Sequence, residues 1–167
     1  MCFEMVPDSL EKPTESGNAA RYPGAAATPE LLVELANQYR IAAMCTAHMG
    51  KPRNPLSRAP TRWLAIHAME LYLNTFLLTR GIDPIEIRKL QHDLAARAEM
   101  AKASGLVLRK KAFQSLLTIS QTREYLVTRY SAEMTVNLTE INRLMATLDQ
   151  LAQITIDEVN KIRKEPL

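Results

Sequence analysis

Apolar residues recur every three or four positions through most of the chain after residue 28, which is the spacing of one face of an α-helix. The alternation of apolar and polar residues that is typical of strands does not occur. Capping residues, prolines and glycines divide this pattern into five predicted helices, at about residues 28–50, 61–80, 83–104, 108–130 and 137–164. Short connections between long helices favour antiparallel neighbours, so the sequence predicts an all-α, antiparallel up-and-down bundle.

Local signals set the ends of these helices. Thr28 followed by Pro29 is typical of a helix cap and first helical position. Gly81 after Arg80 is typical of a helix end. Asn137 and Glu140 have capping-box spacing, which predicts that Asn137 caps the last helix.

The first 27 residues differ from the rest. They contain three prolines and two glycines among polar residues, and nothing periodic in them could bury a face. The sequence therefore predicts a flexible tail over residues 1–27 and one domain over residues 28–167. With 47% hydrophobic residues, a chain of 167 residues can bury one core.

Composition and charge indicate which cellular compartment and which kinds of binding partner to expect. The net charge of +3 combines five acidic and two basic residues within positions 1–30 with a mildly basic remainder, which tolerates a polyanion without requiring one. Cys2 and Cys45 are too few for a disulfide framework, so we expect a reduced, cytoplasmic protein. No signal peptide is visible, and polar residues interrupt the longest apolar run, so we expect no membrane span.

The second predicted helix is apolar nearly all round and carries a single polar stripe. His67, Glu70 and Asn74 are three and four residues apart and share one face. Unpaired buried polar groups are costly, so these side chains need partners. The next predicted helix offers a candidate set: Arg88, His92, Asp93 and Arg97. Two interpretations stay open, a ligand-binding cluster and an internal network that fixes helix register.

At these residues the chain resembles a known family. The stretch 65–74, with Glu70-Leu71 embedded in it, and the stretch Gln91-His92-Asp93-Leu94 resemble two helix signatures of HEPN domains. The resemblance covers about residues 60–130 and identifies residues 28–167 as a HEPN-like helical bundle. It implies a homodimer, an association with nucleotides or RNA, and a place in toxin–antitoxin or defence systems.

The ribonuclease motif of that family is not intact. HEPN ribonucleases use Arg, four to six residues, then His. Only three residues separate Arg88 from His92, and Thr128 stands where a His is expected after Arg123. Threonine cannot shuttle a proton near neutral pH as histidine can. The alternative hypothesis is a divergent metal-independent ribonuclease toxin that uses Arg88, His92, Arg123 and Tyr130.

Other chemistry receives less support. The basic residues Lys102, Arg109, Lys110 and Lys111 could form a phosphate patch or a solvated face, and Arg53, Arg58 and Arg62 make a second basic cluster. A carboxylate-bridged metal site needs paired Glu-x-x-His helices, whereas His67-x-x-Glu70 runs in the opposite order and occurs once. We therefore expect no metal and no cofactor.

The leading hypothesis is a HEPN-like binding or scaffolding module without turnover of its own, associated with a nucleotide or RNA. A third hypothesis is a structural partner that docks on another protein through an exposed apolar stripe of the last predicted helix.

Overall fold

The computed structural model describes residues 26–133 and 138–164, and these residues form helices and no β-strand. Except for Ala26 and Ala27, the predicted tail over residues 1–27 lies outside them. The elements are α1 (Pro29–Ala47), the short 3-10 helix η1 (Pro55–Arg58), α2 (Ala59–Thr79), α3 (Pro84–Lys89), α4 (Leu94–Ala103), α5 (Lys110–Gln121), α6 (Glu124–Tyr130) and α7 (Ile141–Lys164). The predicted all-α class is confirmed.

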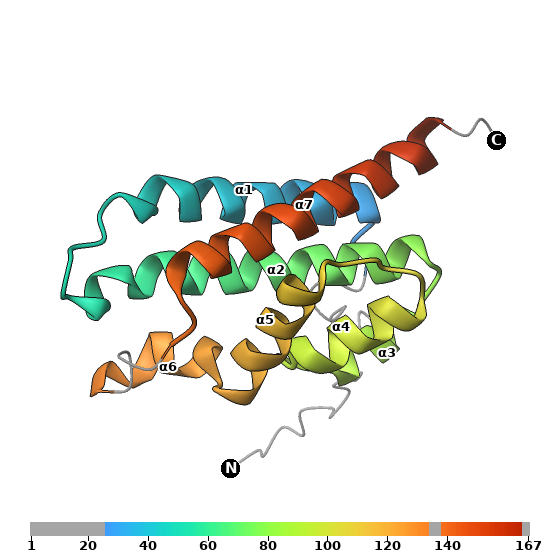
Figure 1. Cartoon of the computed structure of the whole chain (residues 1–167). Coiled ribbons are helices and arrows are strands. Elements are labelled where there is room, and N and C mark those ends of the chain that lie inside the picture. The colour runs from blue at the N-terminus through green and yellow to red at the C-terminus, as the bar shows by residue number, and fades with distance from the viewer. Residues whose placement is uncertain (1–25, 134–137, 165–167) are drawn as a thin grey trace, which may run out of the picture.

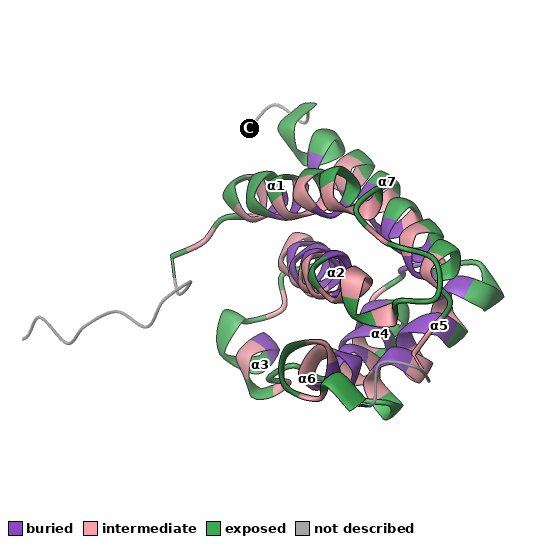
Figure 2. Ribbon diagram, turned by 90° about the vertical axis from the view of Figure 1, so that its left-hand side faces the viewer, coloured by how far each residue is buried: buried purple, intermediate pink, exposed green. Residues whose placement is uncertain are grey.

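Helix α2 lies at the centre of the bundle. Figures 1 and 2 show α1 and α7 on one side of it and the shorter helices α3 to α6 on the other. The largest fully buried side chains of α2 are Met69, Tyr72, Leu73, Phe76 and Leu77. Burying each such side chain stabilises the fold by roughly 1.5–3 kcal/mol. The helix that the sequence predicts to be apolar nearly all round is therefore the one that contacts both layers.

Two of the predicted boundaries agree with the structure. The Thr28 hydroxyl oxygen accepts a hydrogen bond from the Leu31 N–H at 3.3 Å, as expected of a cap. Gly81 follows α2 with a φ of 74°, a conformation that glycine adopts without strain. The predicted start of the last helix is wrong: α7 begins at Ile141, and Asn137 lies outside the described residues.

The prediction of one helix over residues 83–104 is also wrong. The chain forms α3 and α4, separated by a turn in which Gln91 has a φ of 49°. Asp93 begins α4, because its carboxylate accepts a hydrogen bond from the Ala96 N–H at 3.0 Å. The same carboxylate accepts a hydrogen bond from the Ser120 hydroxyl on α5 at 2.7 Å. A contact between distant segments thus favours a new helix start over a continuous helix.

The predicted helix over residues 108–130 is divided in the same way. Helices α5 and α6 meet at Arg123, whose φ of 52° lies in the left-handed region. The break brings Glu124 into the core, where its side chain is fully buried. There Glu124 pairs with Arg62 of α2 at 3.4 Å and accepts a hydrogen bond from the Thr139 N–H at 2.6 Å. Seven α-helices within the described residues therefore replace the five that the sequence predicts.

The apolar stripe of α7 faces the core. Its buried members are Leu144, Leu148, Leu151, Ala152 and Val159. The expected exposed docking stripe on the last helix is therefore wrong, because the bundle itself covers that face. The part of the chain that the structure describes has no helix long and apolar enough to cross a membrane.

Candidate functional site

A cavity of about 610 Å³ lies between α1, α2 and α3. Its volume is within the range of roughly 300–1,000 Å³ that is usual for small-molecule sites. One part of its lining is apolar and comes from Ala27 before α1 and from all three helices: Leu32, Leu35, Leu71, Leu78, Pro84 and Ile87. The other part is polar: His67, Glu70, Asn74, Arg88, Gln91, His92 and Arg97. A largely apolar cavity with a few converging polar groups is the usual form of a binding site.

Ion pairs join α2 to α4 and to the turn before α4 in the polar part of this cavity. Oε1 of Glu70 lies 3.3 Å from Nη2 of Arg97, and its Oε2 accepts a hydrogen bond from Nδ1 of His92 at 3.1 Å. Nε of Arg97 donates to Oδ1 of Asn74 at 2.7 Å. The guanidinium also donates to the Leu90 carbonyl at 3.2 Å. These contacts, which we call the Glu70 network, join the polar stripe of α2 to α4 and to the turn before it.

Arg97 is the most deeply buried member of the Glu70 network, with 3% of its surface exposed. Desolvation lowers the pKa of its guanidinium, and the negative charges of Glu70 and Asp93 act in the opposite direction. A buried charge that is paired and hydrogen-bonded in this way holds its neighbours in fixed positions. The network therefore gives the cavity a rigid polar part whose charges already compensate one another.

His67 lines the cavity but belongs to a different cluster. Its ring lies against the edge of Tyr39 with centroids 4.4 Å apart and is stacked with Trp63 at 6.0 Å. Desolvation by burial lowers the pKa of His67, and the charge of Glu70 opposes that effect. Among the described residues, no hydrogen bond joins His67 to Glu70. The sequence brings His67 to the correct face of α2, but its partners are aromatic rings from α1 and α2.

A second cavity, of about 420 Å³, lies on the other side of His92. Its lining combines the turn between α3 and α4 with the junction of α5 and α6: Lys89, Leu90, Gln91, His92, Asp93, Ala96, Ser120, Arg123 and Tyr125. His92 tilts over Tyr125 with ring centroids 5.6 Å apart. Gln91 and Arg123, both with positive φ, line this cavity, and non-glycine residues in that conformation often cluster at functional sites.

Asp93 serves as a helix cap as well as a wall of the second cavity. The Ser120 hydroxyl contributes most to lowering the pKa of its carboxyl group, followed by the Ala96 N–H. The Oδ1 atom of Asp93 accepts both hydrogen bonds. We therefore assign Asp93 a structural role first.

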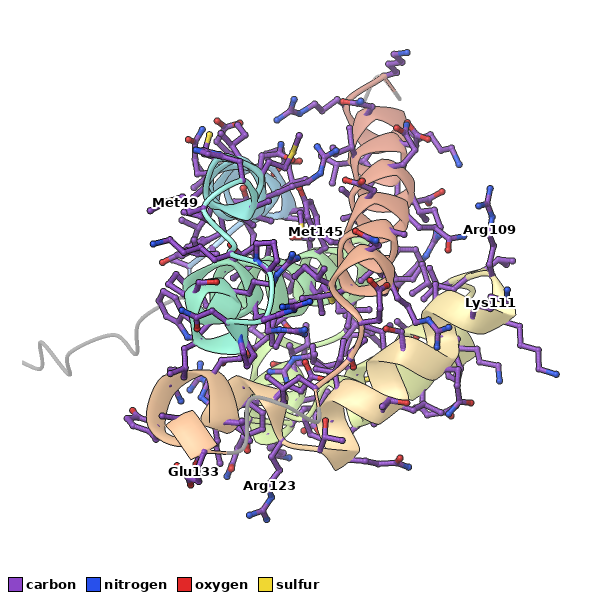
Figure 3. The ribbon with its side chains drawn as sticks, turned by 60° about the vertical axis from the view of Figure 1, so that its left-hand side comes forward. Met49, Arg109, Lys111, Arg123, Glu133 and Met145 are labelled. Carbon is purple, nitrogen blue, oxygen red and sulfur yellow. The ribbon has the colours of Figure 1, made fainter. Side chains whose placement is uncertain are left out.

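The four candidate catalytic residues do not meet in one cavity. Arg88 lines the first cavity, Arg123 the second, and His92 both. Tyr130 lines neither cavity; it is 74% exposed and stacks with the neighbouring guanidinium of Arg129. Figure 3 shows the Arg123 side chain projecting away from the helices.

Thr128 stands where the ribonuclease motif of HEPN domains has a histidine, and it also has a structural contact. The Thr128 hydroxyl donates to the Glu124 carbonyl at 2.7 Å, within α6.

The predicted phosphate patch is spread over two helices. Lys102 of α4 lies over the ring of Phe113 in α5, with Nζ 4.7 Å from the centroid. Arg109, Lys110 and Lys111 are exposed at the start of α5. Figure 3 shows Arg109 and Lys111 extending away from the helix and from each other. The arrangement is that of a solvated basic surface.

The second basic cluster is partly structural. Arg62 is buried by α6, where it pairs with Glu124, whereas Arg53 is exposed in the loop before η1. Burial lowers the pKa of Arg62, and Glu124 opposes that effect. Sequence reasoning did not identify Glu124 as a buried residue, because the polar residues around it are typical of a solvent-exposed helix.

Residues 26–133 and 138–164 bring together no group of three or more His, Cys, Asp or Glu side chains that could hold a metal ion. No protein-family model matches the sequence, and searches of curated proteins and of solved structures find no match.

Proposed function

We propose that this chain is a HEPN-like binding module that acts as a homodimer and takes a nucleotide in the cavity between α1, α2 and α3. The observation that carries the proposal is the combination of an apolar wall with the Glu70 network in one cavity of about 610 Å³. A nucleobase has apolar faces and a hydrogen-bonding edge, which match the two parts of this lining. Arg88 and His92 lie where a phosphate would find positive charge and hydrogen-bond donors.

The same geometry favours binding over turnover. A general base must reach the proton that it removes, and its pKa must suit that transfer. In the cavity between α1, α2 and α3, His92 and Arg97 both contact Glu70, and Asn74 accepts from Arg97. These contacts hold each group in a hydrogen bond or ion pair, so a ligand meets a fixed surface. The absence of histidine at Thr128 supports the same conclusion.

Calorimetric titration with the four ribonucleoside monophosphates tests the proposal. We expect at least one of them to bind, and we expect Arg88→Gln to weaken that binding at least tenfold. Arg129→Gln removes the same charge from the exposed end of α6, outside both cavities, and serves as the matched control. Absence of binding to all four, or equal effects of the two variants, would contradict the proposal.

Substitution of His92 distinguishes a role in ligand binding from a purely structural role. Its side chain is 56% exposed, so its pair with Glu70 contributes little to stability, about 0–1 kcal/mol. We therefore expect His92→Ala to keep a nearly unchanged melting temperature and to lose nucleotide affinity. A large drop in melting temperature with unchanged affinity would identify His92 as a structural clamp instead.

A divergent metal-independent ribonuclease is the second candidate. It is favoured by one observation, that His92 and Arg123 line the same cavity of about 420 Å³ with Tyr125. Incubation of purified protein with labelled single-stranded RNA tests it, with His92→Ala and Arg123→Gln as controls. Cleavage that both substitutions abolish would replace the binding proposal with this one, and intact RNA in all samples would support the binding proposal.

A further inference from the structure

The outward side of α1 is apolar although the surrounding helices leave it uncovered. Within residues 29–49, six of the nine exposed residues are apolar: Leu31, Leu35, Ile41, Met44, Cys45 and Met49. The other three are Glu34, Gln38 and His48. Leu31 and Met49, near the two ends, are 66% and 61% exposed. The apolar surface therefore runs along the whole helix.

Helix α7 provides a direct comparison, because it lies beside α1 on the same side of α2 (Figures 1 and 2). The exposed residues of α7 are polar apart from Ala146 and Ile162: Asn142, Arg143, Asp149, Gln153, Asp157, Asn160, Lys161, Arg163 and Lys164. Outer helices usually turn such a polar face to water. A continuous exposed apolar face of the kind seen on α1 marks an interaction surface.

The spacing on α1 is that of a helix that pairs with another helix. Leu31, Leu35, Gln38, Ala42 and Cys45 follow one another at alternating intervals of four and three, and Met49 continues the series. This alternation is the spacing of the seam of a coiled coil. All of these residues are exposed except Ala42, which is half-buried.

The polar residues beside this seam indicate the identity and direction of the pairing helix. Glu34, Ile41 and His48 lie one heptad apart along its edge, so Glu34 and His48 are equally distant from Ile41. In an antiparallel pair of two α1 helices centred near Ile41, Glu34 of each chain faces His48 of the other. A parallel pair would put the two copies of this edge on opposite sides of the seam, where Glu34 cannot face the partner's His48. The exposed face of α1 is therefore complementary to a second copy of itself when the two helices run antiparallel.

We propose that α1 is the dimer interface and pairs antiparallel with α1 of a second copy of this chain. The inference rests on the homodimer named under the proposed function, and it adds the face, the direction and the register. With 19 residues, α1 is about 28 Å long. In the antiparallel register Leu35 lies opposite the partner's Cys45, and the two Ile41 side chains meet at the centre.

Disulfide trapping tests this register, and the experiment uses the full chain with Cys2→Ser to remove the other thiol. Adding Leu35→Cys should give a covalent dimer under mild oxidation, because the new thiol lies across from the partner's Cys45 and a disulfide needs Cα atoms about 4.4–6.8 Å apart. Adding Leu35→Cys and Cys45→Ser together should give none, because two residues at position 35 would be about 15 Å apart along the helix axis. Cross-linking of the Cys2→Ser chain through Cys45 alone would overturn the antiparallel direction.

Charge insertion tests the face independently. Ile41→Glu places two carboxylates at the centre of the pair, so we expect the dimer to dissociate at least tenfold more readily by sedimentation or light scattering. Ala146→Glu adds the same charge to the exposed face of α7 and should leave the dimer intact.

A dimer that Ile41→Glu does not weaken, or that Leu35→Cys does not trap, would overturn the α1 interface while leaving the proposed homodimer in place. A monomeric wild-type chain would contradict both the α1 interface and the proposed homodimer. Nucleotide titration of that monomer would still test the binding cavity separately.

Discussion

Arg97 carries a positive charge into the bundle, where 3% of the residue remains exposed. Its guanidinium is compensated by Glu70 and by hydrogen bonds to Asn74 and the Leu90 carbonyl. Replacement by methionine keeps much of the volume but leaves the Glu70 carboxylate without this partner. Because breaking a buried pair from one side costs about 3–5 kcal/mol, we expect Arg97→Met to lower the free energy of unfolding by an amount in that range.

Urea denaturation measures this loss, and Arg40→Met is the matched control. Arg40 pairs with Asp149 at 2.9 Å, but the two side chains are 30% and 55% exposed, so we expect a loss of about 0–1 kcal/mol. Equal losses in the two variants would mean that the Glu70 network contributes no more than a surface ion pair.

His67 makes part of the stability depend on pH. Burial among Tyr39 and Trp63 lowers its pKa below the usual 6.5, so the unfolded chain binds the proton more readily than the folded one. The free energy of unfolding should therefore fall as pH drops from about 6.5 toward the lower folded-state pKa. We expect wild-type protein to lose more stability between pH 7.5 and pH 5.5 than His67→Gln does, and an identical pH dependence of the two would contradict this.

For single residues of the site, the sequence predicts which face of a helix each one occupies, because helix periodicity determines that face. The i, i+4 spacing of Glu70 and Asn74 indicated a shared stripe, and the structure brings Arg97 and His92 to it. The partners of His67 and the burial of Glu124 were not predictable, because both depend on how separate helices approach one another. The role of this network in binding a ligand stays a prediction.

The junction between α5 and α6 is a short element with its own energetics. Arg123 has a φ of 52°, a conformation that costs a non-glycine residue roughly 1–2 kcal/mol. Glycine avoids that strain but gains freedom in the unfolded chain, so we expect Arg123→Gly to be neutral or to stabilise by up to about 1 kcal/mol. Arg129→Gly, within α6, should instead destabilise by about 1 kcal/mol. Thermal denaturation compares the two, and an equal loss in both would contradict the strained junction.

The broken helices show where sequence patterns stop being informative. Apolar spacing continues across residues 90–94 and 121–124, and neither segment contains a proline or a glycine. The breaks arise from contacts between distant segments: Asp93 with Ser120 in one case, and Glu124 with Arg62 in the other. Long-range hydrogen bonds of this kind leave no periodic signal, whereas Thr28 and Gly81 act locally and were identified.

In the whole molecule, helix α1 takes part in both proposed roles. The cavity between α1, α2 and α3 combines apolar residues with the Glu70 network, and the outward face of α1 is apolar and self-complementary. The class of fold and the nearly all-round apolar character of the central helix followed from composition and periodicity. The cavity could not be predicted from the sequence, because its lining depends on how α1, α2 and α3 approach one another.

Chemical-shift mapping of a bound nucleoside monophosphate tests the central claim most directly, since it locates the ligand on the folded chain. The amide resonances of Asn74, Leu78, Ile87, Arg88 and Gln91 should shift together and saturably, while those along α7 should stay unchanged. Shifts confined to Lys102 and Arg109–Lys111, or no saturable shift with any of the four nucleotides, would contradict a binding site between α1, α2 and α3.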